Sequence, residues 1–548
     1  MRLSIAQITE FSRALTIVPA RDSHHIIQRL SWDSRTVQPD MLFVALPGDG
    51  FDGNDFIIEA FERGAAVVIA SRQVTEAERL VAEQYRAALL YASDGQLALQ
   101  RLASAWREML DAKVVGITGS SGKTSTKALV SAILARAYLT VSSLGNRNNE
   151  IGLPATVLSA SPSTEVLVVE MAMRGFGQIE ELCAVARPHI GIVTNIGPVH
   201  LATLGSKDNV ACAKAELVAA LPRDTGIAIL NGDDPYTPRI RELAQTFERE
   251  VRVMLFGLER HNDIRATNID FDSDGQPSFD LLLPDGDARR VKLNLQGKHS
   301  VYNALAAATA GVQLEVDPSQ IVWALEQVKP VPMRQVRHEL EDGTLVIDDS
   351  YNANPDSMRA ALELLGRLPK TRLRIAILGD MGELGVEEIA LHEGIGEAVY
   401  LNEVDLLVTI GAMASHYGIG AQATGMDSTR IISCSDIEEA MTVLVPLREK
   451  APIMLVKASR FMGLERVVDY LIQGYQPPPV VTEAQDGAES DGIEDAAEGG
   501  AAEGAAAEGA AAEGAADKSD GTRDAAEGGA KGVEGAVTND ETGQKDHE

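Results

Sequence analysis

The stretch Val114–Lys127 has the sequence VVGITGSSGKTSTK, and it decides how the chain around it folds. Its first residues, Val114 to Ile117, are mostly apolar and predict a short buried parallel strand. A loop rich in Gly and Ser follows, and a helical pattern then runs from Ser125 to about Tyr138. A strand, a glycine loop and a helix in this order bring backbone amides and the positive end of a helix together, which favours the binding of anionic oxygens.

The loop closes with Gly-Lys-Thr, which strengthens the prediction of a phosphate site. Lys123 adds a full positive charge, and the hydroxyl of Thr124 can bind Mg²⁺. Ile117 stands where the strict Walker pattern has glycine, so the motif is the shorter Gly-x-x-Gly-Lys-Thr form. The alternative is a turn before an ordinary helix, but the closing Lys-Thr favours a nucleoside triphosphate. The predicted loop consists of Thr118, Gly119, Ser120, Ser121, Gly122, Lys123 and Thr124.

Length and composition limit the class of protein. A chain of 548 residues is too long for one core, and three to four units are expected. We expect no signal peptide and no membrane span, because no apolar run reaches the roughly 18 residues that a span needs. Three cysteines far apart in the sequence make no metal-binding pattern and suit a reducing cytoplasm.

The net charge of −31 is distributed unevenly along the chain. Residues 481–548 contain 19 Asp and Glu against 4 Lys and Arg. An acidic protein is a poor candidate for binding nucleic acid, because phosphate repulsion opposes association. The nucleotide is therefore expected to be a substrate, and no nucleic-acid partner is predicted.

Alternating strand and helix patterns predict an α/β protein with three folded units and a tail. We expect an N-terminal unit at residues 1–88, a central unit with the phosphate loop at 89–328, and a doubly wound unit at 329–476. Residues 477–548 are rich in Ala, Glu and Gly and predict a disordered acidic tail, either a solvated extension or a segment that binds a partner. Strands are expected at 41–46, 66–70, 165–170 and 190–195, and near 344–348, 373–378, 405–410 and 452–456.

Several polar residues follow the predicted central strands, where ligands bind in open parallel sheets. Glu170 ends one strand, and His200 follows another. Each has a structural alternative, since Glu170 can be a satisfied carboxylate at a strand end and His200 a core histidine. Lys214 would ordinarily be a solvated lysine on a helix. Together, Thr124, Glu170 and His200 supply a hydroxyl, a carboxylate and an imidazole, which form a plausible Mg²⁺ set.

The order of the motifs resembles the Mur ligase family over residues 1–472. The motifs are GSSGKT, GNRNNEIGLP, VVEMAMRG, NIGPVHLATLGS followed by AKAEL, LNGDDP, GKHSVYNALAA, VIDDSYNANPDS, LGDMGELG and LVKASRFMGLERVV. The resemblance implies three domains, with a P-loop-type central sheet and a Rossmann-like C-terminal domain. It does not extend to the acidic tail.

Within that family, GNRNNEIGLP and DDSYNANP are typical of the member that adds D-alanyl-D-alanine to a UDP-linked muramoyl tripeptide. The member that adds the third amino acid usually carries Asp-Asn-Pro-Arg in its last domain, and this tetrapeptide is absent from the chain. The resemblance implies an ADP-forming amide ligase. ATP would phosphorylate the tripeptide carboxylate, and the amine of the dipeptide would attack the acyl phosphate.

The resemblance also implies roles for particular residues. Lys123 would contact the β- and γ-phosphates, and Thr124 and Glu170 would hold one Mg²⁺. His200 would help to hold a second ion with Lys214 as a carbamate. The nucleoside and γ-phosphate would meet Asn303, Arg334 and Asp349. Candidates for substrate contacts are Ser34, Arg35, Asp52 and Gly53 near the uridine diphosphate, Asn146, Asn148 and Asn149 in the asparagine loop, and Asn352, Asn354, Lys457, Ser459 and Arg460 at the peptide end.

Some alternatives stay open at this stage. The asparagine loop can contact substrate or be a plain loop, and His392 can serve the site or the core. His24 and His25 are expected on the surface. A nucleotide-gated binding protein without turnover is the alternative from another class, although two metal ions are more than a switch needs. We expect a monomer.

Overall fold

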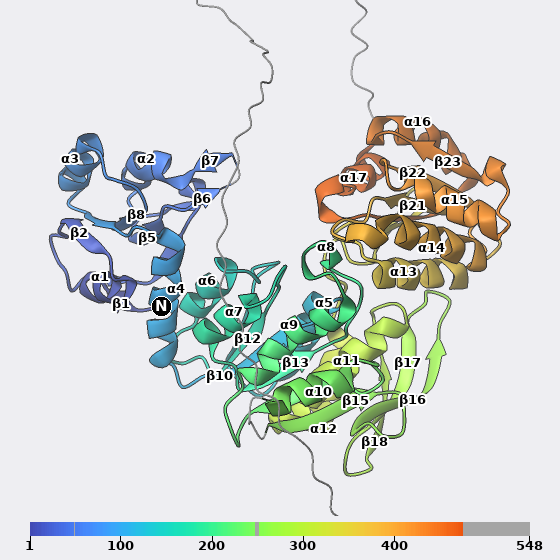
Figure 1. Cartoon of the computed structure of the whole chain (residues 1–548), viewed down its shortest axis with the longest axis horizontal. Helices are drawn as coiled ribbons and strands as arrows, with labels where there is room; N and C mark the ends of the chain where they lie inside the picture. Colours follow the sequence, from blue (N-terminus) through green and yellow to red (C-terminus); the bar gives the residue numbers. More distant parts are fainter. Residues whose placement is uncertain (49, 247–250, 475–548) are drawn as a thin grey trace, which may run out of the picture. The chain divides into compact units, whose positions relative to one another are not determined.

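The strand predicted before the phosphate loop is β10 (Lys113–Thr118), which lies inside a nine-stranded sheet of the computed structural model (Figure 1). The structure describes residues 1–48, 50–246 and 251–474. The order across the sheet is β11-β12-β10-β13-β14-β15-β16-β17-β18, and the pairs from β11 across to β16 are all parallel. The other strands are β11 (Thr140–Ser142), β12 (Val166–Glu170), β13 (Ile190–Val193), β14 (Ile227–Asn231), β15 (Arg252–Gly257), β16 (Ile264–Phe271), β17 (Pro277–Leu282) and β18 (Ala288–Lys292).

The last three strands of this sheet differ from the parallel sheet that was expected. Strands β16, β17 and β18 pair antiparallel, so the parallel sheet continues into a meander. Apolar and polar residues alternate in this region, and the strands are joined through Asp274-Gly275 and Asp285-Gly286. Asp-Gly pairs between alternating segments favour hairpin connections.

Helices cover both faces of the central sheet, because each buried strand directs alternate apolar residues to opposite sides. Val115 and Ile117 belong to the core under α5 and α11, whereas Val114 belongs to the core shared with α4 and α9. Helix α5 begins at Lys123, slightly earlier than predicted. The helices are α4 (Gly95–Glu108), α5 (Lys123–Leu134), α6 (Gly152–Ser159), α7 (Gln178–Ala186), α8 (Leu201–Leu204), α9 (Lys207–Ala219), α10 (Thr237–Thr246), α11 (Lys298–Gln313) and α12 (Pro318–Gln327).

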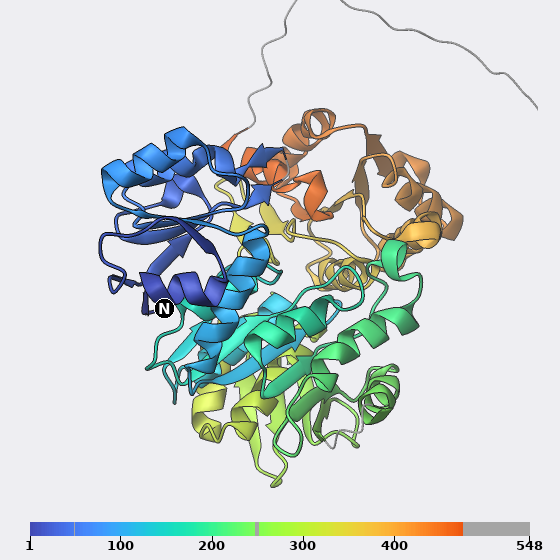
Figure 2. The same ribbon diagram turned by 60° about the vertical axis from the view of Figure 1, so that its left-hand side comes forward.

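The N-terminal residues form a five-stranded sheet with the order β2-β9-β8-β5-β4, in which β2 runs antiparallel to β9 (Figure 2). One face packs on α2 and α3, and the other packs on α1 and α4. The elements are β1 (Leu3–Ser4), α1 (Ile5–Ser12), β2 (Leu15–Val18), β3 (Ile26–Ile27), β4 (Arg29–Ser31), β5 (Met41–Val44), β6 (Pro47–Gly48), β7 (Phe51–Asp52), α2 (Ile57–Glu62), β8 (Val67–Ala70), α3 (Glu76–Tyr85) and β9 (Ala88–Tyr91).

A third sheet of six strands has the order β19-β20-β24-β21-β22-β23, in which only β19 pairs antiparallel with its neighbour. A mostly parallel sheet of this kind is typical of a doubly wound fold. Helices α13, α14 and α15 pack on one face, and α16 and α17 on the other. The elements are β19 (Val336–Glu339), β20 (Leu345–Asp348), α13 (Pro355–Arg367), β21 (Arg374–Gly379), α14 (Glu388–Leu401), β22 (Leu406–Ile410), α15 (Ser415–Thr424), β23 (Ile431–Cys434), α16 (Ile437–Leu447), β24 (Ile453–Lys457) and α17 (Glu465–Gln473).

The three sheets lie within one compact unit, Met1–Pro478. Strand β9 belongs to the first sheet, so that sheet continues past the boundary predicted at residue 88. The division into three domains therefore stays a prediction, and the tail predicted at 477–548 lies outside the described residues. No helix in the described ranges is long and apolar enough to cross a membrane.

Candidate active site

The phosphate loop connects the carboxyl end of β10 to the first residue of α5. Gly119 has a φ of +149°, and a Cβ there would lie 1.8 Å from Thr194 Oγ1. Gly122 has a φ of +79° and lies against Asn303 of α11. The backbone N–H of Ser121 donates to Asn195 Oδ1 at 2.9 Å. Glycine is thus required at both ends of a loop that is anchored to the neighbouring strand.

Two lysines and a glutamate surround the first turn of α5. Lys123 donates from Nζ to the Gly119 carbonyl at 2.8 Å, and Lys127 lies 3.2 Å from Glu170 Oε2. Glu170 is 1% exposed at the end of β12. Burial opposes its ionisation, but the charges of Lys127 and Lys123 outweigh burial and hold the pKa of Glu170 below its usual value. Burial lowers the pKa of Lys123.

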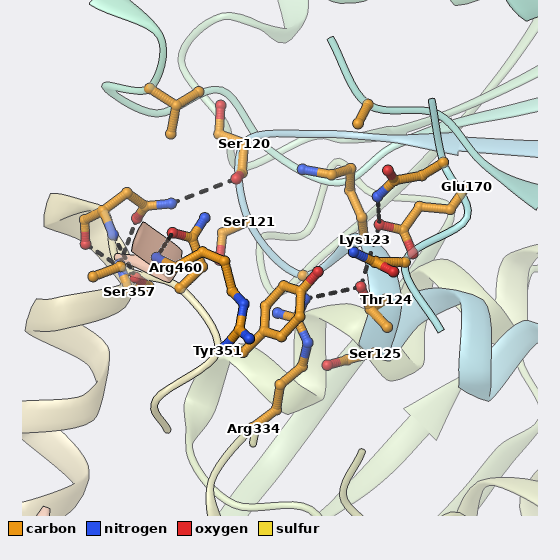
Figure 3. Close-up of a pocket in the computed structure, with 18 of the residues that line it drawn as sticks. Ser120, Ser121, Lys123, Thr124, Ser125, Glu170, Arg334, Tyr351, Ser357 and Arg460 are labelled. Carbon is orange, nitrogen blue, oxygen red and sulfur yellow. Dashed lines mark hydrogen bonds between the residues drawn. The ribbon is translucent and has the colours of Figure 1, made fainter. Parts of the chain in front are cut away.

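Thr124 and Glu170, which were predicted to share a metal ion, are in direct contact. The Thr124 hydroxyl donates to Glu170 Oε1 at 3.2 Å and accepts from Arg334 at 3.0 Å (Figure 3). Glu170 Oε1 also accepts from the Asn148 amide at 2.8 Å. The asparagine loop therefore reaches the carboxylate at the centre of the site, which favours a functional role for that loop over a plain connection.

Sequence reasoning did not single out Lys127. This residue is 5% exposed, donates to the Gly145 carbonyl at 2.6 Å and neutralises Glu170. The signal was its spacing of four residues from Lys123, which puts both lysines on one face of the helix. A carboxylate buried on that face must lie close to both.

His200 lies in the same cavity, where its ring contacts a glutamate that the sequence analysis did not single out. It precedes α8 with a φ of 54°, and its Nδ1 contacts a carboxylate oxygen of Glu383 from the third sheet's unit. Glu383 also lies 3.5 Å from Arg174 Nε. His200 makes no hydrogen bond or ion pair with Thr124, Glu170 or Lys214 among the described residues, and its role as a metal ligand stays a prediction.

Lys214 is 2% exposed on α9, and no hydrogen bond or ion pair of its amine is found in the described part of the chain. Three residues further along α9, Leu217 packs against Gly116 and Gly191, so this helix face is turned to the sheet. Burial, followed by the positive charge of Lys123, lowers the pKa of Lys214 well below its usual value. The lysine is therefore not the solvated helix residue of the structural alternative.

The third sheet contributes a group of side chains from the carboxyl ends of β20 and β24. Lys457 pairs with Asp349 at 2.8 Å and donates to the Asn352 carbonyl at 2.8 Å. The Ser459 hydroxyl donates to the Ala353 carbonyl, and the Arg460 backbone N–H donates to Asn352 Oδ1. Asn354 caps α13 and approaches the Ser120 carbonyl at 3.5 Å. These predicted residues are brought together, and several of them also shape the loop that carries them.

The four residues predicted near a uridine diphosphate do not line the main cavity. Ser34 is buried and donates to Glu59, while Arg35 is exposed and pairs with Asp33. Asp52 caps the turn that contains Gly53. The N-terminal sheet instead reaches the cavity through Trp32, whose ring lies 5.0 Å from the guanidinium carbon of Arg147.

The remaining candidates have defined positions. Asn303 accepts from the Thr126 hydroxyl at 3.2 Å and lines the cavity. Asn149 caps the start of α6 by accepting from Gly152. His392 is fully buried, accepts from the Met381 backbone N–H at 3.0 Å and stacks on Tyr417, so its role is structural. His24 and His25 are exposed, as predicted.

The cavity has a volume of about 1010 Å³ and is lined by residues from the three parts of the chain that carry the three large sheets. It combines a loop of backbone amides, several cations and a buried carboxylate. Among the described residues no group of three or more His, Cys, Asp or Glu is arranged to hold a metal ion. Thr124 and Glu170 nevertheless supply adjacent oxygen donors, and Glu170 Oε2 has Lys127 as an ion-pair partner but accepts no hydrogen bond in the described part of the chain. Oxygen donors of this kind suit Mg²⁺.

The fold and the site define an ATP-dependent ligase of the Mur type, and comparisons with family models agree. The model of the Mur ligase family, catalytic domain, matches residues 26–112, that of the Mur ligase middle domain matches 117–311, and that of the Mur ligase, glutamate ligase domain matches 333–460. The chain belongs to the Mur ligase family.

Particular relatives narrow this class. The chain is 37% identical over 511 residues to the UDP-N-acetylmuramoyl-tripeptide–D-alanyl-D-alanine ligase of Mycobacterium tuberculosis, covering 86% of this chain and 98% of that relative. A crystal structure of MurF from Acinetobacter baumannii is 30% identical with a TM-score of 0.76, covering 86% of this chain and 99% of that chain. MurF of Thermotoga maritima in complex with ADP is 28% identical with a TM-score of 0.68, covering 81% and 96%.

Proposed function

We propose that the chain joins D-alanyl-D-alanine to a UDP-N-acetylmuramoyl tripeptide in an ATP-dependent, ADP-forming reaction that supplies the pentapeptide precursor of peptidoglycan. The observation that carries this proposal is the phosphate loop, whose Thr124 contacts both Glu170 and Arg334. It brings a phosphate site, a buried carboxylate and a cation from the segment before β19 to one point. The identity to MurF relatives over 86% of the chain supports the choice of substrates.

The chemical difficulty is that a carboxylate is a poor electrophile. Transfer of the γ-phosphoryl group of ATP to the tripeptide carboxylate breaks the terminal P–O bond of ATP and gives an acyl phosphate and ADP. The amine of D-alanyl-D-alanine then attacks the acyl carbon, loses a proton, and inorganic phosphate leaves. Such catalysis consists mainly of positioning and neutralisation of charge. Lys123 and Arg334 are the cations at the phosphate end, and closure of the cavity on the bound substrates would exclude water from the acyl phosphate.

Thr124 and Glu170 would hold a first Mg²⁺, which neutralises phosphate charge when it is bound. For a second ion, we infer that Lys214 is carbamoylated and acts with His200. The lowered pKa favours the unprotonated amine, whose lone pair can attack CO₂, form an N–C bond and release a proton. The product is an anion on a buried side chain that has no other partner among the described residues. Asn303, Arg334 and Asp349 are proposed to contact the nucleotide.

We propose that the peptide end of the UDP-muramoyl tripeptide contacts Asn352, Asn354, Lys457, Ser459 and Arg460. We propose that the asparagine loop contacts the same tripeptide substrate. The three cysteines are free thiols, which supports a reducing compartment such as the cytoplasm.

Phosphate release from ATP tests this function. We expect release with Mg²⁺, UDP-muramoyl tripeptide and D-alanyl-D-alanine together, background release without either substrate, and no release by Lys123→Ala. Release that needs a UDP-muramoyl dipeptide and a diamino acid instead would assign the chain to the ligase that adds the third residue. ATP binding without turnover for any pair would contradict a ligase.

A further inference from the structure

Tyr351 follows β20, lines the cavity and is absent from the roles discussed above. The guanidinium carbon of Arg334 lies 4.3 Å from the centre of its ring, and that of Arg460 lies 5.9 Å from it. Figure 3 shows the side chains of Arg334 and Arg460 beside this ring, at the level of the phosphate loop. A guanidinium within about 6 Å of an aromatic face is attracted by the ring quadrupole.

Arg334 lies in a segment whose backbone is in an unfavourable conformation on both sides of it. The residues on either side of it, Met333 and Gln335, have φ values of 60° and 55°. Non-glycine residues with positive φ persist when the surroundings hold them there. The backbone N–H of Tyr351 donates to the Met333 carbonyl at 3.2 Å. Tyr351 thus holds this segment twice, through its backbone and through its ring.

The Arg334 side chain points toward the phosphate loop. Its Nη2 donates to Thr124 Oγ1 at 3.0 Å, and it forms no ion pair with a carboxylate among the described residues. The positive charge is therefore free to meet phosphate oxygens at the loop. Arg460 differs, because it pairs with Glu465 at 2.9 Å while keeping its place near the ring.

We propose that Tyr351 is a positioning residue for phosphoryl transfer, whose aromatic ring holds the Arg334 guanidinium over the phosphate loop and keeps Arg460 on the same wall of the cavity. Two cations beside one ring would otherwise repel each other, and the negative ring face offsets part of this repulsion. The ring performs this function, and the phenol hydroxyl is not required. The proposal rests on the proposed ligase function.

Tyr351→Leu and Tyr351→Phe separate the ring from the hydroxyl. We expect Tyr351→Leu to lower kcat for phosphate release about tenfold to thirtyfold, with a smaller change in the KM for ATP, because Arg334 acts mainly on the charge that develops during transfer. Tyr351→Phe keeps the ring and should stay within about threefold of the wild-type kcat. Tyr470→Leu is the matched control, because Arg466 lies 5.9 Å from that ring outside the cavity lining.

A double-mutant cycle tests whether Tyr351 acts through Arg334. In the Arg334→Ala background, Tyr351→Leu should cause little further loss of kcat, since the residue that it positions is already gone. Additive losses would overturn the proposal, and so would a loss in Tyr351→Phe as large as in Tyr351→Leu, or a wild-type kcat in Tyr351→Leu. Tyr351→Met replaces the leucine variant if thermal unfolding shows that the latter does not fold.

Calorimetric titration with ATP and Mg²⁺ separates this proposal from the ligase function. Tyr351→Leu and Arg334→Ala should weaken ATP binding non-additively even without the other substrates. Absence of turnover in the wild type, with this coupling present, would refute the ligase function alone. Independent effects on binding, with turnover present in the wild type, would refute the positioning role alone.

Discussion

Two lysines of this protein are buried to the same extent but differ in the partners of their amines. Lys214 on α9 and Lys457 at the end of β24 are each 2% exposed. Lys457 has the Asp349 carboxylate at 2.8 Å and the Asn352 carbonyl at 2.8 Å. Lys214 has no such partner among the described residues, and burial holds its pKa well below the usual value.

The comparison shows that burial alone does not set the chemistry of a side chain. Desolvation disfavours the charged form of a buried lysine, and an opposite charge within about 4 Å favours it. Of the two lysines only Lys457 has such a partner among the described residues, and through Asp349 and the Asn352 carbonyl it holds the loop after β20 at the proposed peptide end of the site. The lowered pKa of Lys214 favours the neutral amine, which is the form that reacts with CO₂.

The largest effect is expected from Lys214→Met on catalysis. Removal of a proposed metal ligand should lower turnover by at least about a hundredfold, since even residues behind metal ligands cost that much. A short carboxylic acid such as formate should restore part of the activity by replacing the lost carboxylate. The measurement is phosphate release with and without formate. Lys207→Met, an exposed lysine on the same helix, is the control and should keep wild-type turnover.

Lys457→Met should instead act on stability. It leaves the Asp349 carboxylate buried without its cation, which costs about 3–5 kcal/mol in the free energy of unfolding. Lys214→Met leaves no charge unpaired and should cost much less. Urea unfolding of both variants measures the difference. The double variant Lys457→Met with Asp349→Asn should recover part of the lost stability. Equal losses in the free energy of unfolding for Lys457→Met and Lys214→Met would contradict the difference between the two lysines.

Lys214 also predicts a dependence of stability on pH. Its folded pKa lies below its unfolded value of 10.5, so the unfolded state binds more protons in that interval. Its unfavourable contribution therefore grows as pH falls from 10.5 toward the folded pKa, by about 1.4 kcal/mol per pH unit. In CO₂-free buffer, wild type should lose stability with falling pH faster than Lys214→Met. Parallel curves for the two proteins would contradict the shift.

The smallest effect is expected at an exposed lysine. Lys370 pairs with Glu403, and their side chains are 65% and 62% exposed. Water screens such pairs, so Lys370→Met should change the free energy of unfolding by less than about 1 kcal/mol. A cost comparable to that of Lys457→Met would show that burial is not what separates these lysines.

Elements of the fold and site that depend on neighbouring residues in the sequence could be predicted, whereas those that depend on contacts between distant residues could not. The strand β10 and the phosphate loop follow from local pattern, and Glu170 from its place at a strand end. Helix α5 was also predicted, but it begins at Lys123 and not at Ser125. The antiparallel strands β16–β18 were missed, although Asp274-Gly275 and Asp285-Gly286 signalled hairpins.

The contacts between distant segments could not be predicted in this way. The pairing of His200 with Glu383 joins residues 183 positions apart, and the contact of Arg334 with Thr124 joins residues 210 apart. The burial of Lys214, which has no partner within residues 1–48, 50–246 and 251–474, depends on how closely α9 packs on the sheet. No local pattern in the sequence encodes these distances.

Transfer of ¹⁸O from the tripeptide carboxylate tests the central claim most directly. The wild-type protein would be supplied with ATP, Mg²⁺, D-alanyl-D-alanine and a UDP-muramoyl tripeptide labelled in its terminal carboxylate. Our account predicts one ¹⁸O atom in each phosphate released, because the carboxylate oxygen leaves with the phosphoryl group. Unlabelled phosphate formed together with the amide product would contradict activation of the carboxylate by ATP in this site.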